Sequence, residues 1–142
     1  MTIKPYLHTV HYHETDKMGI AHHANYVKWM EQARIDFLAQ LGFSYAQLEA
    51  EGIASAVTEL SVSYLKSVGF EDTLRIAVSA EAYNGVLLRL RYSGENAANG
   101  DAVFTAHSAH CFLNAAGRPS RLPRLHPALD EALRRLAAET AQ

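Results

Sequence analysis

Five polar residues that can take part in catalysis lie close together ahead of a predicted helix. They surround Gly19 and are Glu14, Asp16, His22, His23 and Asn25. A helix start offers unpaired backbone N–H groups and a partial positive charge, which can hold an oxygen that gains negative charge. Asp16 supplies a carboxyl group that can act there as a nucleophile or as a general base. The stretch therefore predicts an active site, and the residues leave both roles of Asp16 open.

The helix that follows is long and amphipathic. Apolar residues recur at spacings of three and four along one stripe: Tyr26, Met30, Ala33, Phe37 and Leu41. Trp29 and Leu38 widen this stripe, and the periodicity predicts a helix with one buried face. Gly42 stands just past the last periodic residue, where glycine forms a left-handed cap at the least cost.

Most of the other predicted elements are strands. A first strand is expected over residues 5–13, and a short helix with Ser44 as its N-cap over residues 43–52. Alternating apolar residues predict four more strands, over residues 53–66, 73–83, 86–93 and 101–113, with a polar loop over 94–100. Asn84-Gly85 predicts a type I′ turn, because both residues accept a positive φ. A last helix is expected over residues 128–138.

This order of elements predicts an α+β fold in which an antiparallel sheet buries one face on the long helix. The core between helix and sheet is expected to contain Met30, Phe37, Leu60, Val62, Leu88, Leu90 and Phe104. No internal repeat, low-complexity tract or linker interrupts the pattern, so residues 1–142 are expected to form one domain.

Composition excludes several classes of function. The chain has 49% hydrophobic and 20% charged residues, as a soluble globular protein does. Its net charge of −2 gives no excess of positive charge that would bind nucleic acid or an acidic membrane. The N-terminus has no signal-peptide pattern, and no apolar run approaches the roughly 20 residues that span a bilayer. The lone Cys111 cannot form an intramolecular disulfide. We therefore expect a cytoplasmic protein.

The motif ETDxxGxxHHANY, from Glu14 to Tyr26, carries a family resemblance. Together with ExAR inside the helix and LG at its end, it resembles the hotdog-fold acyl-CoA thioesterases of the 4-hydroxybenzoyl-CoA thioesterase-like family, including the YbgC-type members. The later segment VSYLKSVxxEDTLRI is similar to the second and third strands of that family. The resemblance runs from about His11 to Leu113, which is most of the chain.

This resemblance implies a long helix wrapped by a curved antiparallel sheet of about five strands. The implied activity is hydrolysis of acyl-CoA to a free carboxylic acid and CoA, with no cofactor and no metal. It also implies homodimers in which two sheets join edge to edge, often paired into homotetramers, with active sites shared between protomers.

The resemblance also assigns the catalytic residues. The family's acidic residue falls on Asp16, and the histidine that YbgC-type members add falls on His23, whose backbone N–H matches the group that polarises the thioester carbonyl. Asp16 can attack that carbonyl to give an anhydride, or deprotonate a water. His22 is the other candidate histidine, although the spacing from Asp16 favours His23. Lys17 departs from the family pattern, in which small residues or proline are common.

Five further residues are expected at the substrate site: Gly19, Asn25, Tyr26, Tyr64 and Lys66. Gly19 suits a turn conformation, Asn25 caps the helix or fixes the loop, and Tyr26 belongs to the core or to the pocket. Tyr64 and Lys66 lie on the strand that runs beside the active site in the family. CoA phosphates favour cationic partners, and the candidates are Lys66, Arg89, Arg91 and Arg118.

Two other functions remain open at this point. A non-hydrolytic hotdog protein that binds acyl-CoA or acyl-carrier protein has the same fold, although the presence of Asp16 argues against it. A metal site formed by His11, His13, His22 and His23 with Asp16 is the other alternative, although no compact metal-ligand motif is present.

Overall fold

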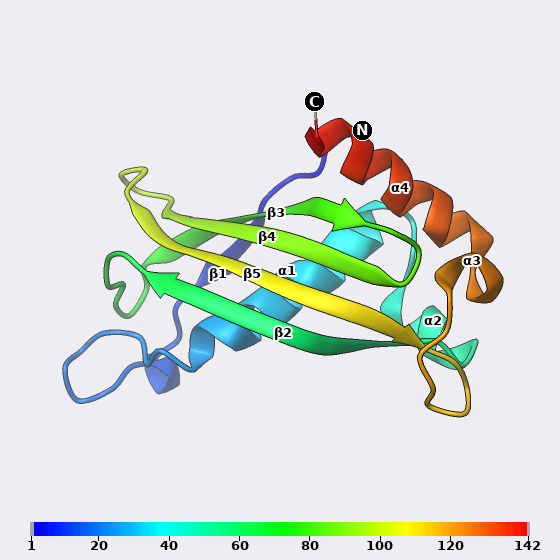
Figure 1. The fold of residues 1–142 in the computed structure, drawn as a ribbon. Helices are drawn as coiled ribbons and strands as arrows, with labels where there is room; N and C mark the ends of the chain where they lie inside the picture. Colours follow the sequence, from blue (N-terminus) through cyan, green and yellow to red (C-terminus); the bar gives the residue numbers. More distant parts are fainter. Residues whose placement is uncertain (1, 142) are drawn as a thin grey trace.

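The computed structural model describes residues 2–141, which form a curved antiparallel sheet wrapped around one long helix (Figure 1). The strands are β1 (Tyr6–Thr9), β2 (Ala54–Tyr64), β3 (Thr73–Tyr83), β4 (Leu87–Asn96) and β5 (Ala102–Leu113), in the order β1-β3-β4-β5-β2. The helices are the 3₁₀ turn η1 (Tyr12–Glu14), α1 (Asn25–Gln40), α2 (Tyr45–Ala50), α3 (Leu122–Leu125) and α4 (Pro127–Ala141). The predicted α+β architecture is confirmed.

The buried stripe of α1 matches the predicted one. Its buried residues are Tyr26, Trp29, Met30, Ala33, Phe37 and Leu38, whereas Leu41 at the C-terminal end is half-buried. Gly42 follows with φ of +96°, as predicted for a C-terminal cap. Ser44 caps α2 and accepts a hydrogen bond from the backbone N–H of Gln47 at 3.3 Å, also as predicted.

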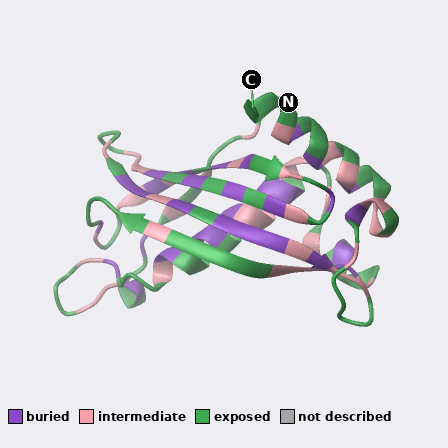
Figure 2. Cartoon of the chain, viewed as in Figure 1, coloured by how far each residue is buried: buried purple, intermediate pink, exposed green. Residues whose placement is uncertain are grey.

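The sheet buries the face that it turns toward α1. Leu88, Leu90 and Phe104 are buried there as predicted, but Leu60 on β2 is 41% exposed and Val62 is only partly buried. Leu60 pairs with the buried Ser108 of β5. The prediction that Leu60 lies on the inner face of the sheet is therefore correct, but the prediction that it is buried is wrong. The reason is that β2 is an edge strand, bonded only to β5 among the described residues. Figure 2 shows most of β2 in the colour of exposed residues.

Three local predictions are wrong. The first strand ends at Thr9, because residues 12–14 turn into η1, closed by the Glu14 carboxylate, which accepts the backbone N–H of His11 at 2.7 Å. The Asn84-Gly85 turn is not type I′, because Gly85 has a positive φ and Asn84 does not. The Asn84 side chain instead accepts hydrogen bonds from the N–H groups of Val86 and Leu87.

The third wrong prediction is the polar loop from Gly94. Strand β4 continues to Asn96, and Gly94 lies under the ring of Phe104, where a Cβ atom would come within 2.2 Å of a ring carbon. Glycine is therefore needed at this position by packing within the strand and does not mark a loop. Helix α3, with proline in its first turn, had no predicted counterpart.

A chain of hydrogen bonds inside the core joins α1 to β4 and β5. Arg34 donates to the Tyr92 hydroxyl at 3.2 Å, the Tyr92 hydroxyl lies 2.7 Å from Ser108 Oγ, and Ser108 Oγ lies 2.7 Å from His110 Nε2. His110 is fully buried, and its Nδ1 has no hydrogen-bond partner within residues 2–141. Burial, and then the positive charge of Arg34, lower the pKa of His110 to about 4.

This buried histidine predicts a loss of stability in acid. The pKa of His110 lies below its value of 6.5 in the unfolded chain, so the unfolded state binds more protons between pH 6.5 and pH 4. The free energy of unfolding should therefore fall by up to about 3 kcal/mol across that window as the pH is lowered. Urea unfolding at several pH values measures this, with His110→Gln as the comparison. Equal pH slopes for the two proteins would contradict the assignment.

Candidate active site

The loop that carries Asp16 is a compact turn. Its ends meet through a bridge between Thr15 and Ala21, the Asp16 N–H donates to the carbonyl of Ile20 at 2.9 Å, and the N–H of Gly19 donates to the carbonyl of Asp16 at 3.0 Å. Gly19 has φ of +79°, which confirms the turn conformation predicted for it. One carboxylate oxygen of Asp16 accepts the N–H of Met18 at 2.8 Å, and the other accepts no hydrogen bond from residues 2–141.

The start of α1 lies beside this turn. The residue before the first helical residue is Ala24, without a side-chain cap, so Asn25 does not cap the helix. Its side-chain amide donates instead to the carbonyl of Glu14 at 2.7 Å. This bond fixes the loop, which is the other role predicted for Asn25. The rings of His22 and His23 stack with their centroids 4.2 Å apart. Within the described residues the backbone N–H of His23 donates to no protein group.

A cleft with a volume of about 330 Å³ opens between this loop, the start of α1 and the end of β2. Figure 1 shows the loop before α1 beside the arrowhead of β2. Five of the predicted site residues line the cleft: Asp16, His23, Tyr26, Tyr64 and Lys66. Gly19 and Asn25 are not among its lining residues and belong to the frame around it. The other lining side chains are largely apolar and include Met18, Ile20 and Leu65.

Two of the cleft's lining residues, Tyr26 and Tyr64, belong to a cluster of aromatic rings. The ring of Tyr26 is almost fully buried, with centroids 4.7 Å from Trp29, 4.9 Å from Tyr64 and 5.3 Å from Phe104. Burial, and then the nearby Tyr64, raise the pKa of Tyr26, so its hydroxyl stays protonated. The Tyr64 hydroxyl donates to the carbonyl of His23 at 2.9 Å, which ties β2 to the start of α1.

The sequence showed Glu14 beside the site but not its role in the structure. Its carboxylate is buried and accepts hydrogen bonds from His11 N–H at 2.7 Å, His8 Nε2 at 2.9 Å and Trp29 Nε1 at 2.6 Å. Burial raises the pKa of Glu14, but the bonds from His11, Trp29 and His8 outweigh it and hold that pKa below 4.5. The available signal was Trp29 on a buried helix face, because a buried indole N–H needs an acceptor.

Among the predicted phosphate-binding residues, Lys66 lines the cleft. It forms an ion pair with Asp101 at 3.1 Å in which both side chains are exposed. Such a surface pair is worth little, so it leaves the ammonium group available to an anion. Arg89 and Arg91 alternate along β4 with the buried Leu90 and Tyr92 and lie on the outer face of the sheet.

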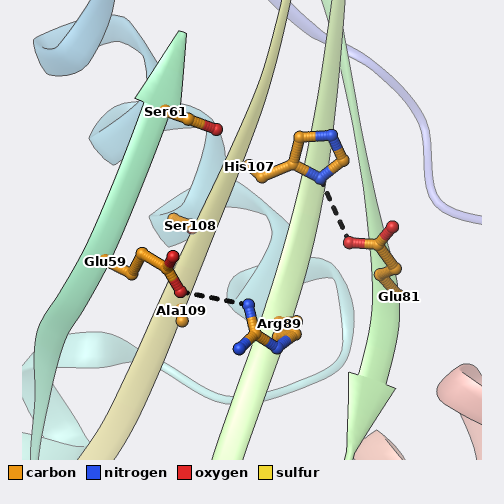
Figure 3. A pocket seen from close by; sticks show the side chains of 7 residues that line it. All are labelled: Glu59, Ser61, Glu81, Arg89, His107, Ser108 and Ala109. Atoms are coloured by element: carbon orange, nitrogen blue, oxygen red, sulfur yellow. Dashed lines mark hydrogen bonds and ion pairs between the residues drawn. The ribbon is translucent and has the colours of Figure 1, made fainter.

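The outer face of the sheet has a second hollow, shown in Figure 3. Arg89 pairs there with Glu59 at 3.2 Å, and His107 pairs with Glu81 at 3.1 Å. Ser61 lies in the same hollow, but no hydrogen bond joins it to His107. These charges neutralise one another, and in the described part of the chain no hydrogen bond joins the serine to a base that could activate it.

The histidines do not gather into the alternative metal site. His11 stacks on His13, with centroids 5.4 Å apart, and His22 stacks on His23. Among residues 2–141, the group with three potential ligand atoms within metal-binding distance is His8, His11 and Glu14, not the set that the sequence suggested. The Glu14 carboxylate in this group already accepts three hydrogen bonds from the protein.

Comparison with known proteins identifies the family. Residues 10–133 match the model of the thioesterase-like superfamily. The chain belongs to this superfamily. A putative acyl-CoA thioesterase of Bacillus subtilis, YneP, is 35% identical over 83% of this chain and 86% of its own length. The 1,4-dihydroxy-2-naphthoyl-CoA hydrolase of Thermosynechococcus vestitus is 31% identical over 85% of this chain and 82% of its own length.

A solved structure of this superfamily confirms the hotdog fold predicted from the sequence. The DHNA-CoA thioesterase from Staphylococcus aureus superimposes with a TM-score of 0.93 at 33% identity, covering 97% of this chain and 93% of the other. Within residues 2–141, no helix has the length and apolar character needed to cross a membrane.

Proposed function

We propose that this superfamily member, a thioester hydrolase, cleaves acyl-CoA into a free carboxylic acid and CoA in the cleft between the Asp16 loop and the start of α1. The observation that carries the proposal is that Asp16 and His23 line one cleft beside the N-terminus of a long helix. The names of the B. subtilis and T. vestitus relatives support a CoA thioester as the substrate.

The chemistry follows from the donors and acceptors around the cleft. The backbone N–H of His23, free of protein partners in the described chain, binds the thioester oxygen as negative charge develops on it. One carboxylate oxygen of Asp16 has no donor among residues 2–141, and that oxygen attacks the carbonyl carbon or removes a proton from an attacking water. Attack by Asp16 expels the CoA thiolate and leaves an anhydride, which water then opens. Both routes give the same two products.

The other predicted residues have supporting roles in this proposal. The imidazole of His23 lines the cleft and protonates the departing thiolate as a general acid. Tyr26 and Tyr64 form the aromatic wall for the acyl group. Lys66 binds a CoA phosphate at the cleft mouth. Gly19 and Asn25 keep the loop in place.

The free edge of the sheet supports a shared active site. Val57, Leu60, Tyr64 and Leu65 are 51%, 41%, 48% and 53% exposed along or just after β2. An apolar edge strand with unpaired backbone groups favours pairing with another strand. We propose that two copies join along β2 as a homodimer, which can pair further into a homotetramer. Because Tyr64 belongs to both the edge and the cleft, a partner on β2 reaches the active site. The cytoplasmic location stays a prediction.

Removing the charge of Asp16 tests the proposed chemistry. Asp16→Asn keeps the shape of the side chain, so the turnover number should fall by at least about 100-fold while the Michaelis constant changes far less. His23→Ala should lower turnover less severely, because its proposed role is to assist. Free thiol released from a panel of short, long and aromatic acyl-CoAs measures both.

The control is the circular dichroism of each purified variant, which must match that of the wild type. Near-normal turnover of a folded Asp16→Asn protein would contradict the proposal. A wild-type protein that binds acyl-CoA but releases no thiol from any member of the panel would favour the non-hydrolytic alternative.

Placing a charge on the β2 edge tests the shared site. Leu60→Glu puts like charges near each other in a β2-to-β2 dimer, so sedimentation velocity should show a shift toward monomer together with a loss of turnover. Leu7→Glu is the matched control, because Leu7 is an exposed leucine on β1 at the other edge of the sheet. A wild-type protein that is a fully active monomer at assay concentration would contradict the shared site.

A further inference from the structure

The buried carboxylate of Glu14 has no role in the proposed chemistry, although it lies two residues before Asp16. Its three donors come from three different parts of the chain. His8 belongs to β1, His11 precedes η1, and Trp29 belongs to the second turn of α1. A buried carboxylate is costly unless donors replace its water, and here each oxygen has at least one donor. Glu14 therefore fixes η1 against both β1 and α1.

The main chain of Glu14 extends this connection to the other wall of the cleft. Its carbonyl accepts the backbone N–H of His22 at 2.8 Å and the side-chain amide of Asn25 at 2.7 Å. His22 directly precedes His23, whose N–H is the proposed oxyanion donor. The residue that anchors the Asp16 turn thus also anchors the peptide that leads to the oxyanion donor.

We infer that Glu14 is a positioning residue, which sets the separation between the Asp16 carboxylate and the His23 N–H. The inference rests on the proposed function, because it assigns Glu14 a role in that reaction. A displacement of about 1 Å between reacting groups can slow a reaction about 100-fold. Glutamine cannot replace Glu14, because its amide has one acceptor oxygen and its NH₂ group must face a donor.

Glu14→Gln should therefore affect the rate more than binding. The turnover number should fall by at least about 10-fold, while the Michaelis constant stays within about 3-fold, because the loop is displaced from the reacting atoms and the rest of the cleft remains. His8→Phe removes one of the three donors and keeps a ring beside Trp29. It should give a smaller loss, and it tests the inference if Glu14→Gln does not fold.

A double-mutant cycle separates positioning from general destabilisation. If Glu14 acts through Asp16, adding Glu14→Gln to Asp16→Asn should lower turnover by less than about 2-fold, whereas independent effects would multiply. Tyr83→Phe is the matched control, because it removes the hydrogen bond from Tyr83 to Asp130 at 2.5 Å, between β3 and α4. It should lower the melting temperature and leave turnover unchanged.

The outcomes distinguish this inference from the function on which it rests. Normal turnover in Asp16→Asn overturns the proposed function and the inference with it. An inactive Asp16→Asn beside a Glu14→Gln variant of near-normal turnover overturns the inference alone. Losses that multiply in the double variant, or an equal loss of turnover in Tyr83→Phe, also overturn it, because Glu14 would then contribute only stability.

Discussion

The constraint on which the site depends is the need to satisfy one buried carboxylate. Glu14 is only 6% exposed, and its carboxylate accepts its hydrogen bonds at 2.6 to 2.9 Å. An ionised group without such donors would cost several kcal/mol in the interior, so these donors together stabilise the folded chain. Because two of the donors come from β1 and α1, and Glu14 itself is the last residue of η1, one local requirement fixes the relative positions of three elements.

The second constraint is the curvature and order of the sheet. Its middle strands bury Leu74, Leu90 and Phe104 against α1, while β2 remains at the edge with exposed apolar side chains. The end of β2 reaches the cleft, and the Tyr64 hydroxyl bonds the His23 carbonyl there. Strand β2, which leaves apolar side chains exposed at the sheet edge, is therefore also a wall of the proposed active site. In the proposed homodimer, this arrangement would connect assembly to the proposed catalysis.

The spacing of apolar residues predicted the regular elements, because that spacing is set by which side of each helix or strand is buried. The α1 stripe and the strand from Thr73 to Tyr83 have the pattern that a one-sided core imposes, and both are found as predicted. Leu60 shows the limit of this reasoning, because alternation gives the face of a residue but not whether another element covers that face. Asn84 and Gly94 show a second limit of sequence patterns, because the type of a turn and the packing of a ring depend on three-dimensional contacts.

The sequence predicted where the candidate site lies, but it did not predict the hydrogen bonds that hold the site in place. Asp16, His23 and Tyr26 lie close together in the sequence, and Tyr64 and Lys66 were assigned by family resemblance; all five line one cleft. The bonds from Glu14 to His8 and Trp29 join residues six and fifteen positions apart, and no sequence pattern connects them. The hydrogen bond from Tyr64 to His23 spans 41 positions and depends on the pairing of β2 with the rest of the sheet.

A crystal structure with a non-hydrolysable acyl-CoA analogue tests the central claim most directly. The account predicts that the oxygen replacing the thioester carbonyl lies about 2.7–3.1 Å from the backbone nitrogen of His23, with the Asp16 carboxylate facing the adjacent carbon. An analogue bound outside this cleft, or one whose oxygen contacts neither the start of α1 nor the Asp16 loop, would contradict it.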